Sequence, residues 1–280
     1  MTRPLRSVLF LPASNARAIE KARGLPCDAV VLDLEDATAP EAKAEARELV
    51  IETLAHGGFG ARTLVVRVNG LDTEWGEADL KAAAEAGPDA VLAPKVTDAE
   101  SLLAYDRRIS GAPERTRLWA MVETCAAVLN LGALAALSAS TRLSALVPGV
   151  NDLSKEMRCK PGKERTPLIP ALALSVTAAR AHGLYAIDGV FNDLGDTFGL
   201  QAECAQGRAL GFDGKCLIHP DQIEAANQAF SPDEAEIAWA RSVIEAFADP
   251  ANAGKGAIRV NGKMAERLHL AEAERILSFR

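Results

Sequence analysis

The chain has 280 residues and a net charge of −7, because 38 acidic residues outnumber 31 basic ones. This balance argues against a nucleic-acid-binding protein, and no apolar run approaches the length of a membrane span. The five cysteines are scattered and form no C-x-x-C pair, so neither a zinc site nor a disulfide framework is indicated. We therefore expect a soluble cytoplasmic enzyme with no nucleic-acid or membrane partner.

Short apolar runs alternate with helical stretches over most of the chain. This alternation predicts right-handed βαβ units and a parallel sheet, which is an α/β fold. Eight units predict closure into a (β/α)₈ TIM barrel, and a doubly wound open sheet is the main alternative. The predicted strands are Ser7–Pro12, Ala29–Asp36, Thr63–Asn69, Ala90–Val96, Leu118–Thr124, Leu143–Asp152, Tyr185–Asn192 and Asp213–Pro220.

Polar residues stand near the ends of seven of these runs, about one βα unit apart. A barrel places the carboxyl ends of all its strands at one rim, where enzymes of this fold keep their chemistry. We therefore expect these side chains to share that rim. They are Glu35, Arg67, Lys95, Glu123, Asp152, Asp188 and His219.

Two carboxylates, Glu123 and Asp152, are predicted to end consecutive strands. Carboxylate oxygens suit Mg²⁺, which often takes only one or two protein ligands and keeps other positions for water or substrate. The alternative is that each carboxylate pairs with a nearby Lys or Arg. Arg67 ends an apolar strand and needs an anion, which is either a substrate or a structural partner such as Glu35.

Two segments fall outside the barrel pattern. The loop Lys155–Arg165 carries five basic residues beside Asp152, and it is either a solvated loop or a binder of anions. Residues 231–280 form a predicted C-terminal helical extension to a barrel domain of residues 1–230. We expect Ser231 to cap its first helix, Ala257–Lys263 to form a hairpin and Ala265–Phe279 to be a final helix. This extension would either cover the barrel's mouth or reach into a neighbouring subunit.

Several motifs, in order and at barrel spacing, carry a resemblance to a known family. They include Asp33-Leu34-Glu35-Asp36, Val66-Arg67-Val68-Asn69, Val122-Glu123-Thr124, Gly149-Val150-Asn151-Asp152 and Gly211 to Pro220. The chain resembles the citrate lyase β-subunit-like branch of the HpcH/HpaI aldolase and citrate lyase superfamily. The resemblance implies a Mg²⁺-dependent carbon–carbon lyase that cleaves a malyl-, citramalyl- or citryl-CoA thioester into a 2-oxoacid and an acyl thioester. It also implies a homo-oligomer, commonly a trimer.

The same resemblance implies roles for individual residues. Glu123 and Asp152 match the metal ligands, and Arg67 matches the residue that stabilises the enolate oxygen. Glu35 and Asp36 match catalytic positions, although Asp36 could instead cap the following helix. The matches to coenzyme A-binding positions are Lys21 for the phosphates, and Phe10, Ile218, His219 and Pro220 for the pantetheine and nucleotide. His219 suits a loop-shaping role better than that of a base.

The C-terminal segment departs from the family pattern. The family's thioester lyases usually carry Met-x-Asp-x-Pro, with the Asp lent by a neighbouring subunit, whereas this chain reads Met264-Ala265-Glu266-Arg267-Leu268. We expect Glu266 to replace that Asp, or else to be only a helix-terminal acid. Three alternatives to the lyase stay open: an aldolase acting on free pyruvate-type acids, a citrate lyase subunit that uses an acyl carrier protein, and a non-catalytic thioester-binding protein.

Overall fold

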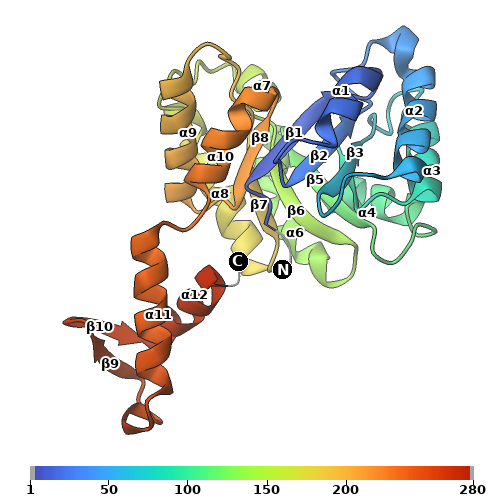
Figure 1. The fold of residues 1–280 in the computed structure, drawn as a ribbon. Helices are drawn as coiled ribbons and strands as arrows, with labels where there is room; N and C mark the ends of the chain where they lie inside the picture. Colours follow the sequence, from blue (N-terminus) through green and yellow to red (C-terminus); the bar gives the residue numbers. More distant parts are fainter. Residues whose placement is uncertain (1–3, 278–280) are drawn as a thin grey trace. The chain divides into compact units, whose positions relative to one another are not determined.

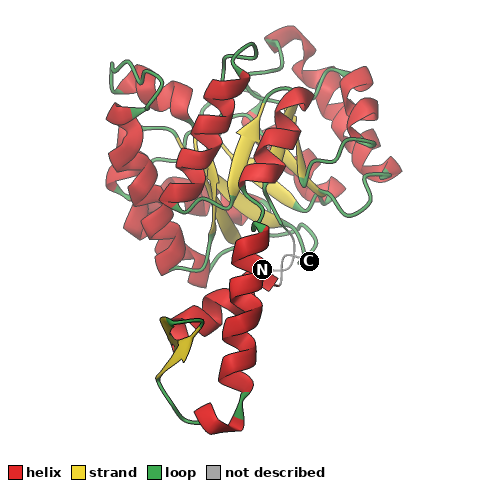
Figure 2. Ribbon diagram, turned by 60° about the vertical axis from the view of Figure 1, so that its left-hand side comes forward, coloured by secondary structure: helices red, strands yellow, loops and turns green. Residues whose placement is uncertain are grey.

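The computed structural model describes residues 4–277, and its main body is a closed barrel of eight parallel strands (Figures 1 and 2). Pairing of the first strand with the last, for example Val8 with Cys216, closes the sheet and excludes the open alternative. The predicted barrel is therefore confirmed. The strands are β1 Ser7–Pro12, β2 Ala29–Asp33, β3 Thr63–Arg67, β4 Ala90–Ala93, β5 Arg117–Val122, β6 Leu143–Pro148, β7 Tyr185–Asp188 and β8 Gly214–Leu217.

The helices surround the strands, as Figure 2 shows. This arrangement explains the sequence pattern, because a strand packed on both faces reads as a continuous apolar run. The helices of the barrel unit are α1 Ala16–Ala22, α2 Lys43–His56, α3 Gly76–Ala86, α4 Ala99–Arg108, α5 Cys125–Leu129, α6 Leu131–Ala136, α7 Val150–Glu156, α8 Ile169–Ala181, α9 Thr197–Leu210 and α10 Ile223–Ala229. None of the described helices is both long and apolar enough to cross a membrane.

The core has two parts that follow from the alternation of side chains along each strand. One buried cluster includes Val31, Val65, Leu92 and Trp119, and the residues that alternate with them belong to a larger second cluster. The second cluster also takes in buried helix residues such as Leu80. Successive strand residues point to opposite faces, so the first cluster fills the barrel and the second joins strands to helices.

The sixth strand is shorter than predicted, and this changes the setting of Asp152. The strand ends at Pro148, and Gly149 is the N-cap of α7. Asp152 therefore lies in the first turn of a helix, where a negative charge is favoured by the helix dipole. The same helix includes Lys155, so the predicted loop Lys155–Arg165 begins later than expected.

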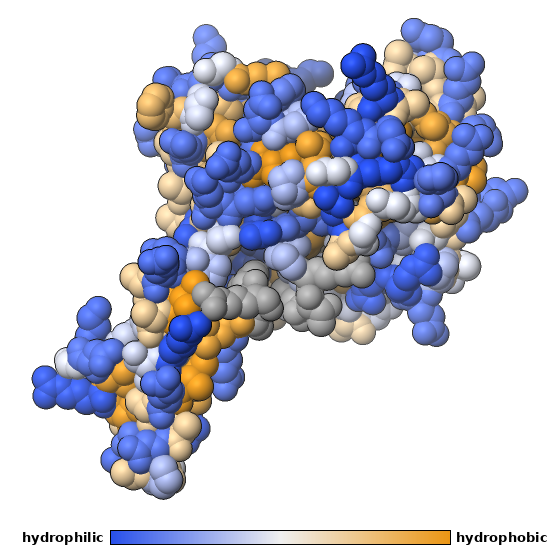
Figure 3. Space-filling view, viewed as in Figure 1, coloured by the Kyte–Doolittle hydropathy of each residue, from blue (hydrophilic) through white to orange (hydrophobic). Residues whose placement is uncertain are grey.

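Residues from Ser231 onward form a second compact unit with its own small core of buried residues, including Ala240, Val243 and Ile258. Its elements are α11 Glu234–Ala248, β9 Ala257–Val260, β10 Lys263–Glu266 and α12 Arg267–Leu277. The predicted hairpin is present, but it extends to Glu266 instead of ending at Lys263. It turns at Asn261 and Gly262, which both have positive φ, as a type I′ turn requires. Apolar surface is visible on this unit in Figure 3.

The predicted cap of α11 is wrong by two residues. Asp233, not Ser231, accepts a hydrogen bond from the backbone N–H of Glu236, and the Glu236 carboxylate accepts one from the N–H of Asp233. This reciprocal capping box satisfies two backbone donors at once, which a serine cap alone would not do. The final helix is likewise shorter than predicted at its start, since Ala265 and Glu266 belong to β10.

Candidate active site

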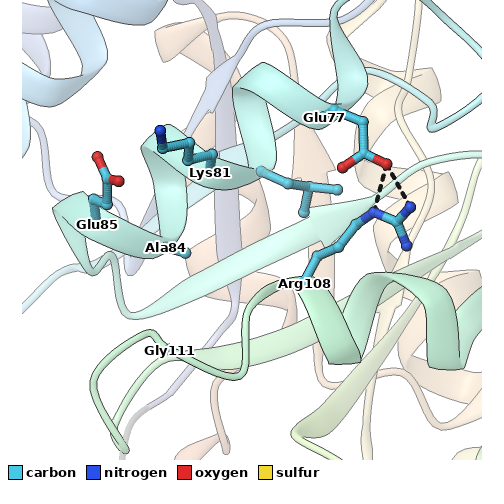
Figure 4. Close-up of a pocket in the computed structure, with 7 residues that line it drawn as sticks. Glu77, Lys81, Ala84, Glu85, Arg108 and Gly111 are labelled. Atoms are coloured by element: carbon cyan, nitrogen blue, oxygen red, sulfur yellow. Dashed lines mark hydrogen bonds and ion pairs between the residues drawn. The ribbon is translucent and has the colours of Figure 1, made fainter.

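A cavity of about 340 Å³ opens at the carboxyl ends of the strands. Most predicted site residues of the barrel line it, together with apolar and backbone groups from the loops that follow the strands. They are Phe10, Asp36, Arg67, Glu123, Asp152 and Ile218. A smaller groove of about 220 Å³ lies between the outer helices α3 and α4, with the Glu77–Arg108 ion pair across it (Figure 4). No strand-end residue lines that groove, so we place the chemistry in the larger cavity.

Arg67 is the centre of the first cluster in this cavity. Its Nε and Nη2 atoms donate to the two carboxylate oxygens of Asp33 at 2.7 and 2.5 Å, a bidentate arrangement. The partner therefore comes from the end of the neighbouring strand β2, since Asp33 is in register with Arg67. The pair fixes the plane of the guanidinium, and Nη1 is left to face Glu35 Oε2 at 2.7 Å.

Glu35 is a nearly buried carboxyl with an unusual proton affinity. Burial raises its pKa to about 8, against the opposing attraction of Arg67, and the nearby charges of Glu123 and Asp36 raise it further. Its Oε2 atom has no aligned hydrogen-bond donor despite the contact with Arg67. The backbone of Glu35, by contrast, is held by hydrogen bonds. Its N–H donates to the Asp33 carboxylate, and its carbonyl accepts from the Lys43 ammonium. A carboxyl poised near neutral pH can give or take a proton.

The pKa of Glu35 predicts a pH-dependent stability. Between about pH 4.5 and 8 the folded chain keeps a proton that the unfolded chain releases, so the free energy of unfolding falls as pH rises. Glu35→Gln cannot titrate. We therefore expect its stability relative to wild type to rise from pH 5 to pH 8, by on the order of a few kcal/mol. Urea unfolding in EDTA measures this, with the exposed Glu52→Gln as control. An identical difference at both pH values would contradict the prediction.

The second cluster joins Glu123, Asp152 and Lys95. Glu123 is buried, and burial raises its pKa, opposed by the backbone N–H and the charge of Lys95. The Lys95 N–H donates to Glu123 Oε1 at 2.7 Å, and the Lys95 ammonium donates to Asp152 Oδ2 at 2.6 Å. The ammonium also lies 3.5 Å from Glu123 Oε1. The two predicted metal ligands are therefore close enough to share one cation.

Gly149 allows this approach. A Cβ atom built on Gly149 would lie 2.6 Å from both Cβ and Oε2 of Glu123 and 2.9 Å from Cε of Met121. Real Cβ atoms do not approach that closely, so any larger residue would push the Glu123 carboxylate out of place.

Of the seven predicted strand-end residues, Arg67, Glu123 and Asp152 line the cavity, whereas Glu35, Lys95 and His219 do not. Asp188 does not line it either. It is fully buried, and it accepts hydrogen bonds from Arg165 at 2.8 Å and from Lys215 at 3.3 Å. Lys215, also fully buried, donates to Glu203 at 2.7 Å. Arg165, at the end of the basic loop, is thus structural. Of the other basic residues there, Lys163 contacts Asp196, and none of them lines the cavity.

This buried network predicts a large loss of stability when Lys215 is removed. Lys215→Met would leave two buried carboxylates, Asp188 and Glu203, with only Arg165 between them as a cation, and breaking a buried ion pair costs about 3–5 kcal/mol. We expect a loss of that size by chemical denaturation. Lys81→Met, on the exposed face of α3, should change stability by less than about 0.5 kcal/mol. A loss below about 1 kcal/mol for Lys215→Met would contradict the prediction.

The residues matched to coenzyme A fall into different settings. Phe10 and Ile218 line the cavity, and the Arg67 guanidinium lies 5.4 Å from the centre of the Phe10 ring. His219 shapes a turn with Pro220: its Nδ1 accepts from the N–H of Asp221 at 3.3 Å. Lys21 lies exposed in the last turn of α1 and does not line the cavity.

The two other predicted catalytic residues, Asp36 and Glu266, lie in different surroundings. Asp36 is exposed, lies 3.7 Å from Nη1 of Arg67 and caps no helix, because the next helical turn begins after Ala39. Glu266 ends β10 in the C-terminal unit, and its N–H donates to Nδ1 of His269.

Asp33 and Lys95 are site residues whose roles the sequence did not reveal. Asp33 stands two residues before Glu35, and its register with Arg67 is seen only in the structure. Lys95 was expected at the rim. Its contact with both carboxylates depends on a left-handed backbone conformation with φ 51°, which no sequence pattern predicted.

Comparison with known proteins finds a family that matches most of the chain. The model of the HpcH/HpaI aldolase/citrate lyase family matches residues 6–220. The chain is 49% identical over 284 residues to the (3S)-malyl-CoA thioesterase of Cereibacter sphaeroides strain KD131, covering 99% of this chain and 97% of that protein. It is 35% identical over 284 residues to the citrate lyase subunit beta of Escherichia coli K12, covering 99% and 93%.

The structure is also similar to that of CitE from Mycobacterium tuberculosis in complex with magnesium, acetoacetate and coenzyme A. The TM-score is 0.76 at 28% sequence identity, and the match covers 99% of this chain and 97% of that one. The likeness therefore includes the C-terminal segment as well as the barrel.

Proposed function

Because the chain belongs to the HpcH/HpaI aldolase/citrate lyase family, in its citrate lyase β-subunit-like branch, we propose that it is a Mg²⁺-dependent enzyme acting on a malyl-type coenzyme A thioester. The observation that carries the proposal is the pairing of two clusters in one cavity. One presents two carboxylates around a cation, and the other presents an oriented guanidinium beside a carboxyl of raised pKa.

The donor set fits a magnesium ion. Glu123 and Asp152 offer hard oxygen ligands, and the Lys95 ammonium already stands between them as a positive charge. Among residues 4–277, no three or more His, Cys, Asp or Glu side chains gather to hold a metal by themselves. Two protein carboxylates with the remaining positions left to water and substrate is the arrangement that Mg²⁺ favours. When bound, the ion would draw charge from the substrate's carboxylate and hydroxyl oxygens.

We propose hydrolysis of the thioester as the reaction, giving a hydroxydicarboxylic acid and free coenzyme A. The 49% identity to a named malyl-CoA thioesterase and the departure at Glu266 from the lyase pattern support this. Glu35 takes the proton of the attacking water, and this base form of Glu35 increases as pH rises toward its pKa of about 8. Arg67, held in plane by Asp33, donates to the oxygen of the thioester carbonyl as charge develops there. The carbon–sulfur bond then breaks, and Glu35 returns its proton to the departing coenzyme A thiolate.

Carbon–carbon cleavage is the second candidate, and the likeness to citrate lyase β subunits favours it. In that reaction Glu35 would take the proton of the substrate hydroxyl. The bond between the hydroxyl-bearing carbon and the thioester's α-carbon would break, and its electrons would form an enolate whose oxygen faces Arg67. Protonation of the enolate would then give the acyl thioester.

Product analysis with (3S)-malyl-CoA and Mg²⁺ separates the two reactions. Hydrolysis releases a free thiol and no 2-oxoacid, whereas cleavage releases a 2-oxoacid and acetyl-CoA without a free thiol. We expect thiol release that stops when EDTA is added. If malyl-, citramalyl- and citryl-CoA all give neither product, the proposed activity is wrong and a binding role is favoured.

We further propose that Glu266 acts in the cavity of a neighbouring copy within a homo-oligomer, which we expect to be a trimer. Its position at the end of a hairpin, in a compact unit with exposed Met264 and Leu268, supports a contact with another chain. Subunit mixing tests this. Glu266→Gln and Glu123→Gln should each be inactive alone, and mixed oligomers should regain activity. Full activity of Glu266→Gln alone, or no recovery after subunit exchange, would contradict the proposal.

A further inference from the structure

We propose that Lys95 is an internal counter-cation of the metal site: its ammonium bridges Glu123 and Asp152 in the metal-free enzyme and is displaced when a divalent cation binds. The inference rests on the proposed function only in taking these two carboxylates as the metal ligands. It adds a competitor, built into the chain, that sets the affinity of the site for metal.

The contacts of Lys95 cover both carboxylates. Its ammonium is 2.6 Å from Asp152 Oδ2 and 3.5 Å from Glu123 Oε1, so it stands where a shared cation would bind. Its own backbone N–H donates to the same Glu123 oxygen at 2.7 Å. One residue thus neutralises half of the site's charge and holds the buried carboxylate in position.

The backbone of Lys95 is specialised for this contact. It has a φ of 51°, in the left-handed region that lysine rarely adopts and that costs on the order of 1 kcal/mol or more. Such a conformation persists only where surrounding contacts hold it, and the hydrogen bond to Glu123 is one of them. Because the backbone is fixed at Glu123, the flexible stem can move without disturbing that carboxylate.

Exposure distinguishes Lys95 from Lys215, which also bridges two acids. The Lys215 side chain is fully buried between Asp188 and Glu203, so its ammonium cannot move into solvent. The Lys95 side chain is 37% exposed and that of Asp152 is 35% exposed, so water reaches this bridge. An ammonium there can turn into solvent at little cost.

The charges at the site predict whether the Lys95 ammonium weakens or strengthens metal binding. Two carboxylates and one ammonium leave one negative charge, whereas adding a divalent cation without moving the ammonium would place three positive charges against two negative ones. Like charges a few ångströms apart repel, so the ammonium and the metal compete for the same oxygens. Removing the ammonium should therefore tighten metal binding.

Manganese binding tests the inference directly, with Mn²⁺ alone as the probe and its free concentration followed by electron paramagnetic resonance. We expect Lys95→Met and Lys95→Gln to bind Mn²⁺ at least about tenfold more tightly than wild type. Lys81→Met, which removes an equal charge from an exposed helix face, should match wild type. Equal or weaker binding by both Lys95 variants overturns the inference. Absence of binding by every protein overturns the metal site itself, and with it the proposed function.

Lysine labelling gives a second readout that needs no variant and so does not depend on their folding. Reductive methylation of the wild-type protein, quantified by mass spectrometry with and without saturating Mg²⁺, reports the release of the ammonium. We expect labelling of Lys95 to rise several-fold with Mg²⁺, while labelling of Lys81 stays constant. Unchanged labelling of Lys95 under metal saturation would show that the bridge persists and would overturn the inference.

Discussion

We expect Glu123→Gln and Asp152→Asn each to lower the Mg²⁺-dependent kcat/KM by at least about 1000-fold while leaving the barrel folded. The expected loss is large because each change removes one of the two carboxylates that we propose to hold the ion, and with it the orientation of the substrate. Steady-state kinetics across a range of Mg²⁺ concentrations measures the effect.

The control for this pair is Glu85→Gln, which removes a carboxylate from the outer groove between α3 and α4 and should retain full activity. Circular dichroism would verify that the variants fold. Unchanged metal affinity in both Glu123→Gln and Asp152→Asn, measured by calorimetry, would show that the ion binds elsewhere.

Arg67→Lys is expected to lower kcat/KM by about 100- to 1000-fold although it keeps the positive charge. Arg67 uses two of its nitrogens to lock onto Asp33 and presents a third to the reacting centre, and a single ammonium cannot do both. The measurement is kcat and KM for the thioester substrate, with thermal unfolding in parallel.

Asp33→Asn is the matched test of orientation, because it keeps the guanidinium but weakens its bidentate anchor. It should lower kcat more than it raises KM. Arg108→Lys, at the exposed Glu77 pair, should be silent. Near-wild-type kcat/KM for Arg67→Lys would make Arg67 a structural residue only.

The barrel could be predicted from sequence because its signal is periodic. Each strand is an apolar run of a few residues followed by a helix, so all eight strands were found at nearly correct positions. The errors occurred where a strand gives way to its loop. A run such as Leu143–Asp152 reads as one apolar segment, but Gly149 begins a helix inside it, and hydrophobicity alone does not mark that point.

The site was less predictable, since its details depend on contacts between distant residues. Glu123 and Asp152 could be singled out by position, but the strand-end pattern also selected Asp188, which is buried with Lys215 and Arg165. Strand position alone does not tell whether a carboxylate faces the cavity or an interior lysine. The left-handed Lys95 and the raised pKa of Glu35 likewise arise from the folded surroundings.

The most direct test of the central claim is a crystal structure with Mn²⁺ and a non-hydrolysable malyl-CoA analogue, using anomalous scattering to locate the metal. We predict one strong Mn²⁺ peak coordinated by Glu123 and Asp152, with the malyl group between that ion and Arg67. An anomalous peak at other residues, or an analogue bound with no peak between these two carboxylates, would contradict the account.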